Sequence, residues 1–260
     1  MGMPHPRIGF VECLEAIRDS DHYGSPVPEG AARGIGTGFW FIIGEQSSAT
    51  VNLNEDGTAT VITGSPDIGG SRASMALMAA EELGIDVHRI TPVVADTESV
   101  GFTDVTEGSR ATFATGMAVV NACRELVDEL KARAATIMGV DSEAVDWIDG
   151  AAVAEGHDPL PLDAITAKAK GTGGPLTVTA SLNAGGAGPS FAAHCCDVAV
   201  DEETGQVTVL RYTTAQDAGT AIHPSYVEGQ MQGGTVQGIG WALNEEYVYG
   251  EDGPMLTAGF

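Results

Sequence analysis

Apolar residues recur every three or four positions in three segments of the chain, at 8–19, 71–83 and about 110–138. This spacing places them on one face of a helix, so we expect an amphipathic helix in each segment. The buried side of the longest helix is expected to carry Met117, Val120, Cys123, Val127 and Leu130. A shorter helix is expected near 164–170, inside a small insertion that covers 139–174.

Strands are predicted between these helices. Single strands are expected at 34–43 and 89–94, and hairpins at 50–63 and 198–210, where apolar and β-branched residues flank turn residues. Each hairpin leads through a short glycine loop to a helix, and the second of these helices starts near Ser225. The repetition predicts an α+β fold of two similar units of mixed or antiparallel sheet with packed helices, and a cleft between them for an extended ligand. Alternatively the likeness is chance, because a hairpin followed by a helix is common.

The 260 residues are enough for two domains, each with its own core. We expect an N-terminal helix and linker at 1–32 and a first α+β unit at 33–180, which contains the insertion. A second α+β unit is expected at 181–260 and is C-terminally incomplete.

The charge excludes several classes of partner. The chain has 36 acidic and 12 basic side chains and a formal net charge of −24. Such a field repels phosphate backbones and anionic lipid, so we expect neither a nucleic-acid partner nor a membrane partner.

The four cysteines show no spacing typical of a zinc or iron–sulfur site, so we expect buried free thiols and no metal ligands in this chain. Residues 1–6 lack the apolar region of a signal peptide, and no apolar run reaches membrane-spanning length. We therefore expect a cytoplasmic location.

The same tripeptide, Gly-Ser-Arg, stands at the start of two predicted helices. Gly69, Gly70 and Ser71 precede Arg72, and Gly108, Ser109 and Arg110 precede Ala111 and Thr112. A helix N-terminus offers free backbone N–H groups and a positive dipole end, and both favour anions. In a chain with nine arginines, the matched pair indicates pyrophosphate recognition. The alternative is ordinary capping by the two serines, with arginines that face solvent.

A third segment, Val227–Gly240, holds three glutamines and five glycines with almost no charge. A glutamine amide both donates and accepts hydrogen bonds, and glycine lets a ligand approach the backbone. The combination favours a large planar heterocycle. The alternative is a glycine-rich packed helix whose glutamines are partly solvated.

No complete catalytic set is recognisable. Asp67, Asp96, Glu98 and Asp217 lie at strand or loop ends without a paired carboxylate, and are expected to be solvated turn residues. His194 lies in an apolar strand and is expected to be a hydrogen-bonded core histidine.

Taken in order, these segments resemble the molybdopterin-binding subunit of the xanthine dehydrogenase, aldehyde oxidase and aerobic carbon monoxide dehydrogenase family. The resemblance covers about residues 8–258 and corresponds to the C-terminal half of that subunit. It is carried by Gly64–Ser71, Ala79–Ile85, Ala95–Glu98, Gly108–Thr112, Asp217–Pro224 and Val227–Gly240.

The resemblance implies the cofactor-binding portion of a molybdenum hydroxylase, which hydroxylates a carbon of an aldehyde or N-heterocycle with water as the oxygen source. The cofactor would be molybdenum-molybdopterin cytosine dinucleotide, lying in the cleft between the two units. Partners would be a complementary molybdopterin-subunit half, an iron–sulfur subunit and an FAD subunit, together with a small-molecule substrate. The cofactor-binding positions that match are Gly69, Gly70, Ser71, Ser109, Arg110, Ala111, Thr112 and, against the pterin, Gln230.

Two departures from the family pattern matter. Gly70 occupies the position of a glutamine that lies near the molybdenum's apical oxo ligand in the family. The family's catalytic glutamate lies in a Gly-x-Gly-Glu motif beyond Phe260, so no catalytic residue is expected in this chain, which would be a fragment or one part of a split enzyme. Two alternatives stay open: a non-catalytic subunit derived from the family, and a nucleotide-binding protein of another fold.

Overall fold

The computed structural model describes residues 7–259 and divides into two compact units. Described residues up to Trp40 and from Pro189 onward form unit 1, and Phe41–Gly188 form unit 2. These boundaries differ from the predicted ones because strand β1 (Ala31–Ile42) pairs with β9 (Ala187–Val200), so the N-terminal segment joins the C-terminal unit. The six N-terminal residues of the predicted 1–32 region, including those read for a signal peptide, lie outside the described part.

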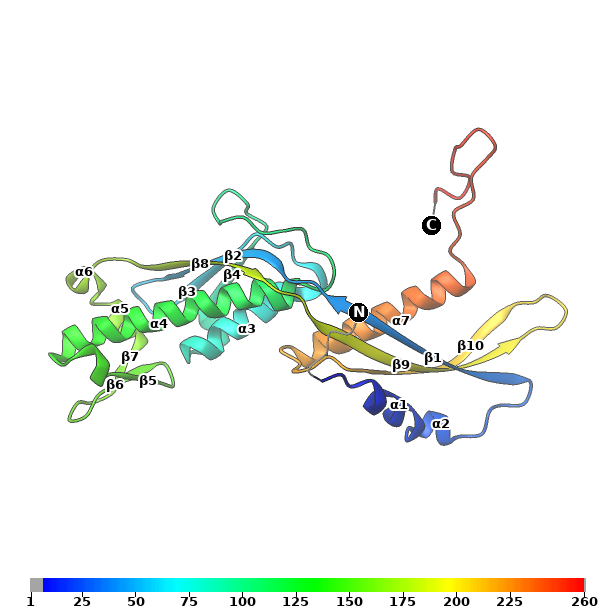
Figure 1. Ribbon diagram of the computed structural model, residues 1–260, viewed down its shortest axis with the longest axis horizontal. Coiled ribbons are helices and arrows are strands. Elements are labelled where there is room, and N and C mark those ends of the chain that lie inside the picture. The colour runs from blue at the N-terminus through cyan, green and yellow to red at the C-terminus, as the bar shows by residue number, and fades with distance from the viewer. Residues whose placement is uncertain (1–6, 260) are drawn as a thin grey trace. The chain divides into compact units, whose positions relative to one another are not determined.

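Unit 1 is built on a three-stranded sheet in the order β1-β9-β10, with β10 at Val207–Gln216 (Figure 1). Strands β9 and β10 are antiparallel, which confirms the second predicted hairpin. Helices α1 (Phe10–Arg18) and α2 (Asp21–Gly24) precede the sheet, and α7 (Pro224–Leu243) follows it.

The core of unit 1 lies between α1 and the sheet. Cys13 and Ile17, one helical turn apart on α1, pack with Ala193 and Cys195, which are alternate residues of β9 and therefore share a face. Helix α1 confirms the predicted N-terminal helix. Helix α7, in contrast, has no residue that is fully buried.

Unit 2 has a four-stranded sheet in the order β4-β3-β2-β8. Its strands are β2 (Glu45–Leu53), β3 (Ala59–Thr63), β4 (Ile90–Val94) and β8 (Leu176–Ala184). Strands β2 and β3 form the predicted hairpin, whereas β3 and β4 are parallel and are joined through helix α3 (Ser71–Leu83). The β3-α3-β4 segment is therefore a βαβ unit.

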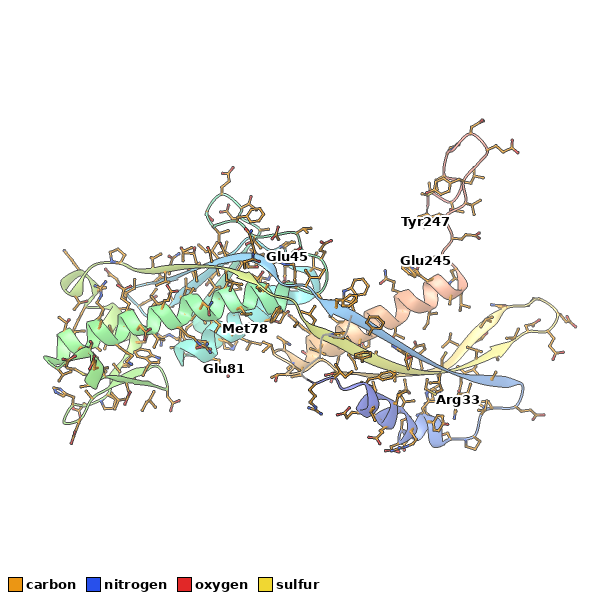
Figure 2. The ribbon with its side chains drawn as sticks, viewed as in Figure 1. Arg33, Glu45, Met78, Glu81, Glu245 and Tyr247 are labelled. Carbon is orange, nitrogen blue, oxygen red and sulfur yellow. The ribbon has the colours of Figure 1, made fainter. Side chains whose placement is uncertain are left out.

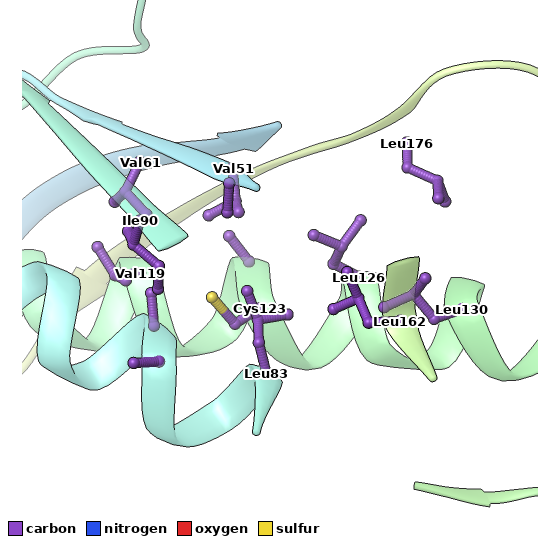
Figure 3. Close-up of a cluster of buried hydrophobic side chains, with 14 of the residues drawn as sticks. Val51, Val61, Leu83, Ile90, Val119, Cys123, Leu126, Leu130, Leu162 and Leu176 are labelled. Atoms are coloured by element: carbon purple, nitrogen blue, oxygen red, sulfur yellow. The ribbon is translucent and has the colours of Figure 1, made fainter. Parts of the chain in front are cut away.

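Helix α4 (Gly116–Met138) lies against this sheet and α3, and its buried residues fill the main core (Figure 3). Val119, Cys123, Leu126 and Leu130 are fully buried. Met117 is 40% exposed, so its predicted burial is wrong. It is two residues from Val119, or about 200° around the helix, and points away from the core.

The region at 139–174 forms a second, small sheet that the sequence did not indicate. Its strands are β5 (Asp146–Ile148), β6 (Ala151–Val153) and β7 (Leu160–Pro161). The helix expected near 164–170 is present as two short helices, α5 (Leu162–Thr166) and α6 (Ala169–Thr172).

Four short helical turns complete the described part of the chain: η1 (Ile68–Gly70), η2 (Val87–Arg89), the π-helical η3 (Ala111–Thr115) and η4 (Ser142–Ala144). Both units mix helices with sheets, which confirms the α+β fold class. No helix within residues 7–259 combines the length and the apolarity needed to cross a membrane.

Candidate functional site

One edge of the unit 2 sheet gathers the loops that the sequence singled out. Because β3 and β4 are parallel, the loops that follow them leave from the same edge. Strand β2 begins at that edge and β8 ends there, since Ala49 pairs with Thr63 of β3 and Glu45 pairs with Ala184 of β8. Ligands of open α/β sheets bind at the carboxyl ends of parallel strands. Figure 2 labels Glu45 at this edge.

The first glycine loop leads from β3 into α3. Gly69 and Gly70 have φ angles of 66° and 78°, a left-handed conformation that favours glycine. Asp67 caps the helix: its Oδ1 accepts from the Arg72 backbone N–H at 2.9 Å, and its Oδ2 lies 2.9 Å from Arg72 Nε. The Ser71 hydroxyl donates to the carbonyl of Pro66 and caps nothing. Asp67 is therefore the cap, and the Arg72 guanidinium is paired with it.

The second glycine loop leads into a helical segment that starts as π-helix and continues without a break into α4. Gly108 and Ser109 have φ angles of 55° and 59°. Ser109 and Thr112 are exposed and Ala111 is half-buried. Isolated π-helical turns are uncommon and are found frequently at functional sites.

The sequence allowed two interpretations of Arg110, a contact with an anion or a side chain that faces solvent. Neither describes the structure. The Arg110 side chain is fully buried. Nε donates to the carbonyl of Gly44 at 2.8 Å, Nη1 to that of Asp104 at 3.0 Å, and Nη2 to the carbonyl of Gln46 at 2.5 Å and to Ser47 Oγ at 2.7 Å. The predicted contact between this guanidinium and pyrophosphate is thus wrong, because its donors are used within the protein.

Buried hydroxyls join the two loops. Thr115 Oγ1 lies 2.9 Å from Ser65 Oγ and 3.2 Å from Ser47 Oγ, so the first loop, the π-helical turn and β2 share one hydrogen-bonded cluster. Helix α3 also contacts η3. The structure therefore brings residues 69–71 and 109–112 to the same edge. Sequence analysis missed the hydroxyl cluster, whose one visible signal is the run of serines and threonine in β2.

The predicted pterin ligand Gln230 lies on α7 in unit 1 and is exposed, as is Gln237. Residues Val227, Met231, Thr235 and Ile239 recur every four positions and are half-buried, so they form the inner side of the helix. The glycines of the helix at 229, 233, 234 and 238 have open space where a side chain would begin. The helix thus presents amides and bare backbone on its outer surface.

The loop before α7 is held by Asp217. Its Oδ2 accepts from the Gly9 backbone N–H at 2.7 Å, and its Oδ1 accepts from that of Gly219 at 3.2 Å. Asp217 is therefore a structural turn residue that ties the start of α1 to this loop. Asp96 likewise accepts from the Ser99 hydroxyl and a backbone N–H, and these bonds lower its pKa.

His194 differs from its expected role. It is half-buried and contacts Tyr212 edge-on, with ring centroids 5.8 Å apart. Its Nδ1 is buried without a hydrogen-bond partner among the described residues. Burial lowers its pKa, so the ring is neutral at pH 7.

One cluster within the described part of the chain has the composition of a metal site. Potential ligand atoms of His22, Cys195 and Asp197 lie within 4.8 Å of one another. However, the Arg33 guanidinium donates to both Asp197 oxygens, at 2.7 and 2.8 Å, and His22 Nε2 lies 3.1 Å from the same carboxylate. A cation beside Arg33 would be repelled, so the cluster fits a buried ion network that holds α2 to the sheet.

Comparison with known proteins gives a family match over most of the chain. Residues 29–260 match the family model described as molybdopterin cofactor-binding domain. The chain is 29% identical to subunit gamma of the 6-hydroxypseudooxynicotine dehydrogenase complex of Paenarthrobacter nicotinovorans, over 96% of this chain and 34% of that protein. It is 31% identical to the aldehyde oxidoreductase molybdenum-binding subunit PaoC of Escherichia coli (strain K12), over 82% of this chain and 28% of that protein.

Two solved structures share the fold. Quinoline 2-oxidoreductase from Pseudomonas putida 86 superposes with a TM-score of 0.83 at 21% identity, covering 99% of this chain and 37% of that one. CO dehydrogenase from Oligotropha carboxidovorans gives a TM-score of 0.77 at 22% identity, covering 95% of this chain and 32% of that one. The chain spans about a third of the length of the relatives it matches.

Proposed function

We propose, from the premise that this chain belongs to the family of molybdopterin cofactor-binding domains, that it forms part of the cofactor-binding region of a molybdenum hydroxylase. The enzyme would hydroxylate a carbon of an aldehyde or N-heterocycle with water as the oxygen source. The names of relatives support this range of substrates, since they include an aldehyde oxidoreductase and a nicotine 6-hydroxylase. The cofactor would be the molybdopterin cytosine dinucleotide, which accepts two electrons from the substrate carbon when it is bound.

The observation that carries the proposal is the convergence of two helix N-termini at one edge of unit 2. Gly69 and Gly70 are left-handed and have no side chain, so a phosphate can approach the backbone of the first loop beside Ser71. The π-helical turn offers the N–H groups of Ala111 and Thr112 at the same edge, beside the exposed hydroxyl of Ser109. These residues fit the pyrophosphate of a dinucleotide. Arg110 would not contact the phosphate, because its backbone N–H donates to the carbonyl of Glu107 at 3.1 Å and its side-chain donors are used within the protein.

Gln230 would hydrogen-bond the pterin. Its exposed amide can donate to and accept from a heterocycle at once, and the neighbouring glycines leave the helix backbone open to a flat ligand. Gly70 cannot supply the amide that the family resemblance expects near the metal. We therefore assign no catalytic residue to this chain, and its role is to bind and orient the cofactor.

Electrons would pass to iron–sulfur and FAD modules, and a complementary part of the molybdopterin subunit would complete the site. The four free cysteines support a reducing compartment such as the cytoplasm. The net charge of −24 opposes a nucleic-acid or membrane partner. A second candidate, a non-catalytic subunit derived from the family, is favoured by Gly70 alone.

The test is the composition of the assembled enzyme purified with its partners. We expect molybdenum by elemental analysis and a releasable pterin dinucleotide. The absence of both would refute the proposal, whereas cofactor without turnover of any aldehyde or N-heterocycle would favour the non-catalytic subunit.

A change of charge at Thr112 tests whether the phosphate binds at this edge. Thr112→Glu places a carboxylate at a helix N-terminus, where it favours the helix by about 0.3–1 kcal/mol but repels an anion. We expect Thr112→Glu to be as stable as wild type but to retain at least about tenfold less cofactor. Thr136→Glu, exposed in the last turn of the same helix, is the control: it opposes the helix dipole and should keep its cofactor. Full cofactor content in Thr112→Glu would contradict phosphate binding at this edge.

A further inference from the structure

Backbone strain is concentrated at the edge of unit 2 that holds the glycine loops. Four described residues other than glycine have positive φ: Glu45 at 66°, Ala95 at 62°, Ser109 at 59° and Asp149 at 47°. Three of them lie in segments that meet at this edge. Such conformations disfavour L-residues and persist where the surroundings fix them, often at functional sites.

One side chain contacts the segments around two of these strained residues. Arg110 donates to the carbonyls of Gly44 and Gln46, which immediately precede and follow Glu45. It is itself the residue after Ser109. The same guanidinium donates to Asp104 in the loop before Ser109. The Arg110 guanidinium is therefore hydrogen-bonded on both sides of the left-handed turn at Glu45. Its bond to Asp104 also closes the loop that contains Ser109.

The buried positive charge of Arg110 couples the positions of the turns at Glu45 and Ser109. The buried guanidinium has its nearest carboxylate, Glu45, at 3.8 Å, and its short contacts are made with neutral oxygens of the backbone and of Ser47. A buried charge is stable only when its donors are satisfied, and here the two turns supply the acceptors. Displacement of either turn would leave part of a buried cation without partners, so the two turns are held in position together.

We propose that Arg110 is a positioning residue that preforms the anion-binding edge without touching the ligand. The inference rests on the proposed function, because it assigns a purpose to the fixed geometry of residues 108–112. Backbone N–H groups that are already oriented bind an anion without a further ordering cost. Lysine keeps the charge of Arg110, but its single ammonium cannot span both sides of Glu45 as the five-donor fork does.

The experiment compares Arg110→Lys with Arg133→Lys in the full chain without cofactor. Arg133 is the matched control, because it is a second buried arginine of the same continuous helix, paired with Glu129 far along α4. Hydrogen exchange of the backbone amides at 43–47 and 108–112 is measured by mass spectrometry. We expect at least about a tenfold faster exchange in Arg110→Lys and no change there in Arg133→Lys. Affinity for inorganic pyrophosphate, measured by calorimetry, should fall at least about tenfold in Arg110→Lys alone.

Unchanged exchange in Arg110→Lys, or an equal increase in Arg133→Lys, would overturn the inference and leave the proposed function standing. Faster exchange confined to the two turns supports it even if wild type fails to bind pyrophosphate, a failure that would count against the proposed function. Should Arg110→Lys not fold, Glu45→Gly is added, since glycine adopts the left-handed turn without strain. The double variant should then fold, and its failure to do so would contradict the role of strain.

Discussion

Gly108→Ala tests how tightly the second glycine loop is packed. A methyl group at this position would lie 2.3 Å from Ile43 Cδ1 and 2.5 Å from its Cγ1. The hydrogen bond from Ile43 N–H to the carbonyl of Gly108, at 3.0 Å, keeps the two backbones together. Alanine at φ 55° costs about 1–2 kcal/mol. Overpacking adds about 1–3 kcal/mol. The free energy of unfolding should therefore fall by about 2–5 kcal/mol.

Gly139→Ala provides the matched control. Gly139 has φ 72° at the C-terminus of α4, and an added methyl group there meets nothing within 4 Å. It should cost only the conformational part, about 1–2 kcal/mol. Urea unfolding of both variants, with the change in free energy taken from the midpoint and slope, separates the two contributions. Cofactor content of the assembled enzyme should fall in Gly108→Ala and stay unchanged in Gly139→Ala.

Equal losses of stability in the two variants would show that the Gly108 position is not overpacked by a methyl group. A second check adds Ile43→Ala to Gly108→Ala, which removes the Cδ1 and Cγ1 atoms and leaves only the Cβ contact at 2.9 Å. The double variant should recover at least about 1 kcal/mol relative to the sum of the single changes. Simple additivity would mean that Ile43 is not what restricts this position.

Three further predictions concern other parts of the chain. Gln230→Ala leaves buried cofactor partners unsatisfied, at about 1–3 kcal/mol each, so the assembled enzyme should retain about ten- to a hundredfold less cofactor, with a milder loss in Gln237→Ala; equal contents in wild type and Gln230→Ala would refute the assignment. The Arg33 hydrogen bonds lower the pKa of Asp197 to about 2, from 3.8, so this stabilisation is complete above about pH 4 and is lost as the pH falls through about 2. Urea unfolding at a series of pH values should show a weaker acid dependence in Asp197→Asn, and an identical dependence would contradict the ion network. Burial raises the pKa of Cys123 to about 12, so a thiol reagent at pH 8 should label it only after unfolding, and rapid labelling of the folded chain would contradict its burial.

The elements that the sequence located well are those with local boundaries. Helix α3 occupies the predicted residues 71–83 because left-handed glycines, Gly70 and Gly84, flank it on both sides. The small sheet at 146–161 escaped notice because its strands have two or three residues, too few for an alternating pattern. The pairing of β1 with β9 was also missed, since it joins segments far apart in the chain and has no local signal.

In the candidate site, too, local features could be predicted from the sequence and long-range contacts could not. Residues 69–71 and 109–112 were recognised from short motifs, and the structure brings them to one edge. The direction of the Arg110 side chain could not be read from the motif. Gly-Ser-Arg has the same local composition at both helix starts, yet Arg72 pairs with Asp67 and Arg110 is buried among carbonyls. The acceptors around the Arg110 guanidinium include Gly44, Gln46 and Ser47, which lie more than sixty residues earlier in the chain.

The discontinuous composition of unit 1 has a consequence for biosynthesis. Its N-terminal strand β1 is synthesised before unit 2, but its partner β9 comes after it, so β1 waits with an unpaired edge that favours aggregation. Folding of unit 2 shortens the search. Glu45 and Ala184 are paired where the chain enters and leaves that unit, so the two flanking strands start side by side and little loop-closure entropy remains to be lost. A substitution that weakens unit 2 should therefore lower the yield of correctly folded unit 1 without altering any of its residues.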